Sequence, residues 1–346
     1  MDSMRLPRPP TMEDVAAEAG VSRALVSIVF RNQPGAGPET RSRVLAVANR
    51  LGYRPDHRAQ LLGRKRTGLI GVVFSLRHTF HGDLVESLYA AAEPVGFEVA
   101  LSAVVPNRDE RTAIEALQSY RCEALVLLGP ELVEEELLAL ARAMPVVAVA
   151  RSLSRSALAL NQLDVVRSDD THGAMAAVNH LRSLDHTDIW HVDGGRAPGA
   201  TERRRGYRTA MRLAGLSTRV LPGGLTEERG AAAAKKLLAE PHQPSAVTVF
   251  NDRSAVGLID TLRRAGAHAP QDLSVIGYDD DHVARLPSVD LSTMRQDTTK
   301  LAAAAMEQAL DRLNGKPCRE TVIPPTLIVR RTTSRFRSRQ GHDRPK

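Results

Sequence analysis

The sequence predicts two folded parts: an N-terminal all-α domain with helix-turn-helix spacing, and a larger α/β domain of two parallel-sheet lobes. Residues 11–52 show only the apolar spacing of helices. From residue 68, short apolar runs alternate with amphipathic segments, which is typical of parallel strands joined by crossover helices. The alternation occurs in two halves of similar build, and 346 residues suffice for each part to bury its own core.

The first helix is expected to begin after Thr11, a good N-cap with Asp14 three residues later. Gly20 ends it, because glycine adopts the positive φ of a helix C-cap at little cost. The apolar residues expected to form the core of the domain are Met12, Val15, Ala16, Ala19, Val21, Val26, Val29, Val44, Val47, Ala48 and Leu51.

Ser22 caps a second helix that is expected to run through about Phe30. A third helix begins at Gly37-Pro38, where proline suits the first helical position, and Gly52 stops it. Two short helices joined by a tight turn have the spacing of a helix-turn-helix. The DNA-binding domain is therefore assigned to residues 11–52, with a structural cap as the alternative.

Residues 53–67 are expected to form a hinge with a short helix, whose strong apolar positions are Leu61 and Leu62. Residues 68–331 form the two lobes, and 332–346 a basic tail without periodicity. The expected strands are Leu69–Phe74, Phe97–Ser102, Ala124–Leu128, Val146–Ala150, Ile189–Asp193, Arg219–Leu221, Ala246–Phe250 and Ser274–Tyr278.

Positive charge is concentrated at the two ends of the chain. Residues 1–66 hold 12 Lys/Arg against 6 Asp/Glu, and residues 330–346 hold 7 against 1, whereas the whole chain carries +7. The part between them is therefore acidic. A basic head points to a polyanionic partner such as DNA. For the tail, a solvated basic segment is the alternative.

Several classes of protein are excluded by what the sequence lacks. Two cysteines cannot make a disulfide framework, and no Cys/His spacing suits a metal, so neither metal nor cofactor is expected. No apolar segment resembles a secretory signal or approaches the roughly 18–20 residues of a membrane span. We expect a cytoplasmic protein with no membrane partner.

The second helix is expected to enter the major groove of DNA. Arg23, at its N-terminal end, could pair with guanine, a contact worth roughly 1–3 kcal/mol of discrimination. Serine and arginine side chains nearby are better suited to phosphates, which fix register but carry little sequence information. The residues expected at the DNA are Thr11, Ser22, Arg23, Ala24, Ser27, Ile28 and Arg31.

The runs TMEDVAAEAGVSRALVSIVFRN and PETRSRVLAVANRLGYRPDHRAQLLGRKRTGLIGVV resemble the lac repressor/galactose repressor family of bacterial regulators, and the resemblance extends to about Arg331. It implies a hinge helix that forms on the operator and lies in the minor groove. The residues matching its DNA contacts are Ala59 and Leu62, and the leucine would wedge into a base step. The alternative for Leu62 is interdomain packing. One departure is Gly37, where the family usually has serine.

The same resemblance implies that the lobes form an effector domain with the fold of periplasmic sugar-binding proteins, whose ligand binds between the lobes near the carboxyl ends of the strands. The matching candidates for contact with a sugar or related metabolite are Ser75, Phe80, Arg151, Arg203, Asn251 and Asp279. Two structural alternatives stay open. Asp279 to Asp281 could be a solvated loop, and Asn251-Asp252 could cap the next helix.

The strand that ends at Ala150 departs from sugar-responsive members, which often have an aspartate at that position. Arg151 follows it here. The loss of a carboxylate removes one acceptor for sugar hydroxyls, so the effector need not be a simple hexose.

A homodimer is expected, because one helix-turn-helix binds too weakly to select an operator, and a two-fold pair reads a palindrome. An enzyme is the first rival function. The sequence has no GxGxxG, GxxxxGK[ST], GxSxG or HExxH, and the neighbouring His186 and His191 are more readily explained by packing. A transport-associated binding protein is the second rival, which the absence of a signal segment and the basic N-terminal module disfavour.

Overall fold

The computed structural model describes residues 8, 10–54 and 66–336. The chain divides into two compact units, Met1–Thr67 and Gly68–Lys346. The division falls where the sequence predicts the α/β domain to begin. Among the described residues, no helix is both long and apolar enough to cross a membrane.

Residues 10–54 of the first unit form three helices, α1 (Met12–Ala19), α2 (Arg23–Phe30) and α3 (Pro38–Leu51). The predicted caps are confirmed: Thr11 and Asp14 form a reciprocal capping box, and the Ser22 hydroxyl accepts a hydrogen bond from the Leu25 amide. Gly20 and Gly52 end α1 and α3 with φ of 65° and 69°, a conformation that favours glycine.

The core of the first unit is the predicted apolar set. Its fully buried members are Val15, Ala16, Ala19, Val26, Val29, Val44, Val47 and Ala48, with Tyr53 added. Met12, Val21 and Leu51 pack at its margin. All three helices contribute to this cluster, so none of them buries its apolar side alone.

The first lobe of the second unit is built on a six-stranded parallel sheet in the order β11-β5-β4-β3-β1-β2. Its strands are β1 (Leu69–Ser75), β2 (Glu98–Val104), β3 (Ala124–Leu128), β4 (Val146–Val149), β5 (Asp164–Ser168) and β11 (Glu320–Ile323). One face packs against α5 (Thr79–Ala92), which the short 3-10 helix η1 (Glu93–Val95) extends, and α13 (Thr298–Leu313). The other face packs against α6 (Glu110–Ser119), α7 (Glu134–Ala143) and α8 (Arg155–Ala159).

The second lobe repeats this plan with the order β12-β10-β9-β8-β6-β7, in which only β12 runs antiparallel. Its strands are β6 (Ile189–Val192), β7 (Arg219–Leu221), β8 (Ala246–Val249), β9 (Ser274–Asp279), β10 (Ser292–Arg295) and β12 (Thr326–Ile328). One face packs against α9 (Asp170–Ser183) and α10 (Ala200–Leu213), the other against α11 (Glu227–Ala239) and α12 (Asp252–Arg264).

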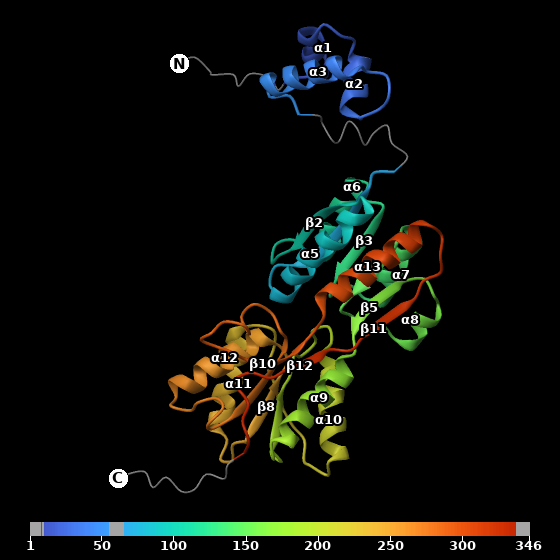
Figure 1. Cartoon of the computed structure of the whole chain (residues 1–346). Helices are drawn as coiled ribbons and strands as arrows, with labels where there is room; N and C mark the ends of the chain where they lie inside the picture. The colour runs from blue at the N-terminus through green and yellow to red at the C-terminus, as the bar shows by residue number, and fades with distance from the viewer. Residues whose placement is uncertain (1–7, 9, 55–65, 337–346) are drawn as a thin grey trace. The chain divides into compact units, whose positions relative to one another are not determined.

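Between residues 66 and 336 the chain passes from lobe to lobe three times. The crossovers are β5 to α9, β10 to α13 and β11 to β12, and Figure 1 shows β11 beside β5 although the two are far apart in sequence. Ser168 on the first crossover donates a hydrogen bond of 2.6 Å to Gln296 on the second. The segments that join the lobes are therefore tied to each other.

All eight predicted strands are present, with their ends shifted by two residues or fewer. Four strands were not predicted: β5, β10, β11 and β12. The prediction of a tail from residue 332 is also wrong at its start. The Thr332 carbonyl accepts a hydrogen bond from the Val275 amide, and the Ser334 amide donates to the Ser274 hydroxyl. The second lobe therefore extends to Phe336, and the remainder of the predicted tail lies outside the described residues.

Helices α11 and α12 approach each other closely at two glycines. A Cβ atom on Gly257 would lie 1.9 Å from the Glu227 carbonyl oxygen, and one on Gly230 would lie 1.8 Å from the Ser254 carbonyl oxygen. Any side chain at either position would therefore push the two helix backbones apart.

We expect Gly257→Ala to lower the free energy of unfolding by about 1–3 kcal/mol, because it overpacks this contact. The matched control is Gly82→Ala in α5, where a Cβ meets nothing within 4 Å; there, alanine should stabilise the helix by roughly 0.5–1 kcal/mol. Urea-induced unfolding followed by circular dichroism measures both. Equal stability of the two variants would contradict the close approach.

Candidate functional site

The residues of α2 predicted to meet DNA lie on its solvent-facing side. Arg23 and Ala24 are exposed, Ser27 and Ile28 are half-buried, and Arg31 directly after the helix is exposed. The opposite side of α2 packs into the core of the unit. The helix thus presents a surface of mixed polarity whose first residue is an arginine.

The two predicted contacts that precede helices are engaged as caps. The Thr11 hydroxyl both donates to the Asp14 carboxylate and accepts from the Asp14 amide, so its hydrogen-bonding capacity is largely used. The Ser22 hydroxyl accepts from the Leu25 amide and keeps its own proton free to donate. Of the two, Ser22 is better placed to bind a phosphate.

Two contacts in this unit were not predicted. Arg23 Nε lies 3.0 Å from Glu13 Oε1 in an ion pair whose side chains are both more than half exposed. Such a pair is worth about 0–1 kcal/mol, so its exchange for a DNA contact costs little. Arg41 from α3 donates to the carbonyls of Val29 and Gln33 and so fixes the loop between α2 and α3. Ala59 and Leu62 lie outside the described residues.

In the second unit, four of the six residues predicted to bind the effector line one small pocket between the lobes. They are Phe80, Arg203, Asn251 and Asp279. The pocket has a volume of about 40 Å³, and His78, His81, Ala150, Pro198, Leu225, Phe250 and Gln296 are among its other lining residues. We call it the inner pocket.

Arg203 is a buried cation that bridges the inner pocket. Its Nε donates to Asp170 Oδ1 at 2.8 Å, and its terminal nitrogen donates to the Phe250 carbonyl at 2.7 Å. Its guanidinium also lies 3.6 Å from the ring centroid of Tyr278 and 3.5 Å from Asp279 Oδ1. Burial lowers the pKa of Arg203, but the carboxylates of Asp170 and Asp279 outweigh burial and leave this pKa above its ordinary value.

Asp279 closes β9 with a φ of 113°, in the region that favours glycine. Its carboxylate accepts a hydrogen bond of 2.7 Å from Gln296 Nε2. Burial raises the pKa of Asp279 to about 7, against the lowering effect of the Arg203 charge. Asp280 and Asp281 are also buried, and Asp280 is ion-paired with Arg330. The alternative of a solvated aspartate loop is therefore wrong.

Asn251 has a structural role in this structure, as one alternative anticipated. Its Oδ1 accepts from the Ser254 amide and caps α12, while its Nδ2 donates to the Leu225 carbonyl. It still lines the inner pocket. A ligand that binds Asn251 would therefore share an atom already bonded to the protein or replace one of these bonds.

Two histidines that sequence analysis missed also line the inner pocket. The rings of His78 and His81 stack with centroids 4.6 Å apart. Burial, with the charges of Arg253 and Arg203, lowers the pKa of His78 to about 4, and burial lowers the pKa of His81 well below its usual range. The Ser75 amide donates to His81 Nδ1, so the neutral ring carries its proton on Nε2. His81 is a fixed hydrogen-bond donor beside the pocket.

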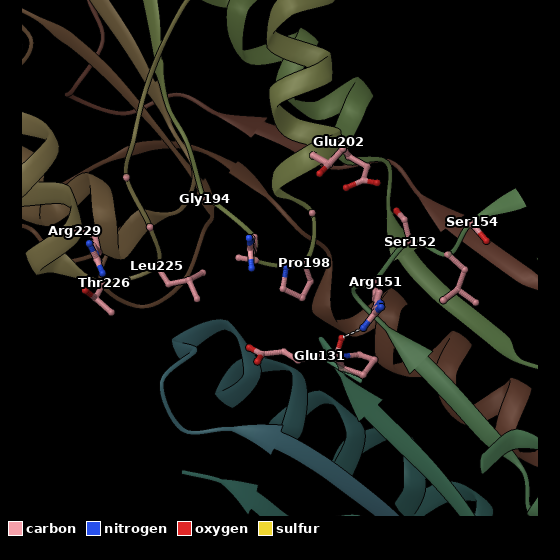
Figure 2. A pocket seen from close by; sticks show the side chains of 18 residues that line it. Glu131, Arg151, Ser152, Ser154, Gly194, Pro198, Glu202, Leu225, Thr226 and Arg229 are labelled. Atoms are coloured by element: carbon pink, nitrogen blue, oxygen red, sulfur yellow. Dashed lines mark hydrogen bonds between the residues drawn. The ribbon is translucent and has the colours of Figure 1, made fainter. Parts of the chain in front are cut away.

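A second, larger cavity of about 980 Å³ adjoins the inner pocket, and Pro198 and Leu225 line both. We call it the outer cavity; Figure 2 shows its lining. Arg151, the fifth predicted residue, lies here, with one guanidinium nitrogen donating to the carbonyls of Pro130 and Leu132. Ser75, the sixth, lines neither space and bonds to its own loop through the Arg77 amide.

The remaining sequence predictions for this unit concern metal ligands and two histidines. In the described part of the chain no three His, Cys, Asp or Glu side chains come together as metal ligands. His186 and His191 do not form a pair. His186 bonds to Ser245 and to the Ser334 carbonyl, whereas His191 is buried against Thr248 and Tyr207. Both rings have packing roles.

Known proteins match the chain along most of its length. Residues 11–56 match the bacterial regulatory proteins of the lacI family, and residues 178–333 match the periplasmic binding protein-like domain. The transcriptional regulator GalR of Escherichia coli is 32% identical over 333 residues, which cover 94% of this chain and 96% of GalR.

Two solved structures are also similar. The crystal structure of a LacI transcriptional regulator from a Rhodococcus species is 46% identical, with a TM-score of 0.74, and the match covers 77% of this chain and 98% of that one. The lac repressor dimer bound to operator and an anti-inducer is 26% identical, with a TM-score of 0.80, over 94% of this chain and 100% of that one.

We expect Arg203→Ala to lower the free energy of unfolding by about 3–5 kcal/mol, because it leaves the carboxylates of Asp170 and Asp279 buried without their cation. Adding Asp170→Asn should recover part of the loss, since it removes one of the two charges. Denaturant unfolding of the single and double variants measures this. If Asp170→Asn lowers the free energy of unfolding further, the unpaired Asp170 carboxylate is not what destabilises the Arg203→Ala variant.

His191 should contribute to the pH dependence of the free energy of unfolding. Burial lowers the pKa of His191 to about 3. As the pH falls through the ordinary value near 6.5, the unfolded chain gains a proton that the folded chain does not, so stability decreases. Compared with the wild type, His191→Gln should lose about 2 kcal/mol less between pH 7 and pH 5. The exposed His242→Gln is the control, and an identical pH dependence in both variants would refute the assignment.

Proposed function

Since the chain belongs to the lacI family of bacterial regulatory proteins, we propose that it is a transcriptional repressor that binds a palindromic operator as a homodimer. Its affinity for DNA is controlled by a small-molecule effector, a sugar or related metabolite, bound between the two lobes. It acts in the cytoplasm and catalyses no reaction.

The observation that carries the proposal is the exposed side of α2. A helix whose two neighbours bury its apolar side, and whose N-terminal residue is an exposed arginine, fits the major groove and can reach a guanine edge. The similarity to the operator-bound lac repressor dimer includes this unit, because it covers 94% of the chain. That likeness supports the same use of α2 here.

Dimerisation follows from the energetics of recognition. One such unit contacts only a few base pairs, and each contact is worth roughly 1–3 kcal/mol. Two units related by a two-fold axis double the number of contacts and match a palindromic site. The proposal therefore includes a second copy of the chain.

The inner pocket supports control by a ligand. It lies where both lobes contribute side chains, and its charged residues bond directly to the crossovers: Arg203 to Asp170, and Asp279 to Gln296. A ligand that binds one arrangement of the lobes better than another shifts the equilibrium toward it. Phe80, Arg203, Asn251 and Asp279 are the proposed contacts within the pocket, and Arg151 the contact in the outer cavity.

The test of DNA recognition is selection from random duplex DNA, followed by affinity measurements with variants. Arg23→Ala should weaken binding to the selected operator by about 1–3 kcal/mol and relax the preference at one base pair. Glu13→Gln removes the partner of Arg23 and one negative charge near DNA, so its affinity should equal or exceed that of the wild type.

Arg50→Ala is the matched control, because Arg50 in α3 forms an exposed ion pair with Glu18 in α1. Two outcomes would contradict the proposal. Arg23→Ala could weaken binding to all sequences equally, which would mean that Arg23 contacts only the phosphate backbone. The wild type could also select no sequence, with or without metabolites.

A further inference from the structure

The outer cavity, rather than the inner pocket, has the size of a ligand site. Small-molecule sites have volumes of roughly 300–1,000 Å³. The outer cavity has about 980 Å³, whereas the inner pocket has about 40 Å³. In this arrangement of the lobes, most of a metabolite would lie in the outer cavity and reach the inner pocket past Pro198 and Leu225.

Both lobes form the outer cavity. The first lobe contributes the loops after β3 and β4, and the second lobe contributes the loops after β6 and β7 with the beginnings of α10 and α11. A ligand there would touch both lobes, as control by a ligand requires.

Three arginines line the cavity and only two carboxylates do. The arginines are Arg151, Arg196 and Arg229, and the acids are Glu131 and Glu202. In the part of the chain that the structure describes, none of these arginines forms an ion pair, whereas Arg203, Arg204, Arg253 and Arg295 each do. Their charges are therefore available to a ligand.

Arg151 and Arg229 approach from different lobes. In Figure 2, Arg151 and Arg229 lie at opposite ends of the lining, with Glu131 and Pro198 between them. The carbonyls of Pro130 and Leu132 hold one guanidinium nitrogen of Arg151 without neutralising its charge, so its remaining donors are held in place for an acceptor. Arg196 and Arg229 are exposed and free to move toward a ligand.

The backbone adds to the positive potential. Helix α10 begins at the cavity, and its N-cap, Gly199, provides no side-chain cap. The amides of its first turn lack intrahelical acceptors and point out of the helix end, where an anion is favoured. A Cβ on Gly199 would lie 3.0 Å from Asp170 Oδ2, and φ there is 81°, so glycine is needed at this cap.

The uncharged part of the lining favours a hydroxylated ligand. The side chains of Ser152, Thr201 and Thr226 supply hydroxyl groups, and no aromatic ring is among the cavity's lining residues, all of which lie in the described ranges. A flat heterocycle would find no aromatic side chain to stack on in the outer cavity. Hydroxyls of a ligand can donate to Glu131 and Glu202.

We propose that the outer cavity binds a polyhydroxylated anion, a sugar acid or sugar phosphate, whose charged group pairs with the exposed Arg196 and Arg229. This rests on the proposed function, because it names the class of effector. Arg151, on the other lobe, adds to the positive potential of the cavity, and the hydroxyls of the ligand face the two glutamates. A cation bound by those glutamates is the competing possibility that the experiment must exclude.

The test measures binding to the full chain by isothermal titration calorimetry. The probes are glucose, glucosamine, glucuronate, glucose 6-phosphate and inorganic phosphate, which differ in charge at comparable or smaller size. At least one anionic probe should bind roughly tenfold or more tightly than glucose, and added salt should reduce this advantage.

The variants assign the effect to the cavity. Arg196→Gln with Arg229→Gln should remove most of the anion's advantage over glucose, since it removes two of the three cationic groups that line the cavity. Arg212→Gln is the control, an exposed arginine in the last turn of α10 outside the lining. Its anion binding should equal that of the wild type.

Several results would overturn the proposal: equal binding of glucose and the anions, tighter binding of glucosamine, an anion advantage that survives in the double variant, or no binding of any anionic probe at about 10 mM. DNA selection separates this failure from that of the proposed function. If the chain selects an operator but its DNA affinity changes only with a neutral metabolite, the proposal of an anionic effector is wrong and the proposed function stands. A chain that binds the anions yet selects no DNA refutes the proposed function instead.

Discussion

The second unit depends on one buried cation, the guanidinium of Arg203. It pairs with the carboxylates of Asp170 and Asp279 and also contacts the rings of Phe250 and Tyr278. Asp170 begins the helix after the first crossover, and Asp279 bonds to Gln296 on the second, which in turn accepts from Ser168. A single network therefore contains the charged lining of the inner pocket and two of the three segments that join the lobes. A change of charge or position at Arg203 therefore also affects those two segments.

The local features of the fold were predictable because short-range chemistry determines them. Thr11, Ser22 and the two C-cap glycines act within one turn of their helices, and eight strands stand out as apolar runs. Strand β5 does not, because the residues DVVRS begin and end with polar side chains that the neighbouring strands and crossover bury. Strands β10 and β12 are short, and residues 332–336 are held only by bonds to distant parts of the chain.

The site was predictable only in part, for the same reason. Resemblance to the family supplied Phe80, Arg203, Asn251 and Asp279, and the structure brings these four together. No pattern in the sequence indicated that Asp170 and Gln296 bond to them, since both lie on crossovers whose positions depend on the completed sheets. The stacked His78 and His81 were missed because one histidine directly before a helix and another in its first turn carry no local signal. The partner of Arg23 lies on another helix and was missed likewise.

The place where residues 332–336 attach has a practical consequence. Ser334 bonds to Ser274, the first residue of β9, whereas Asp279, its last residue, lines the inner pocket. The final described residue, Phe336, thus lies near the amino end of β9, whereas the carboxyl end of this strand lines the inner pocket. A fluorophore or a surface tether attached at position 336 would therefore sit away from the inner pocket, so immobilised protein should keep its access to small molecules.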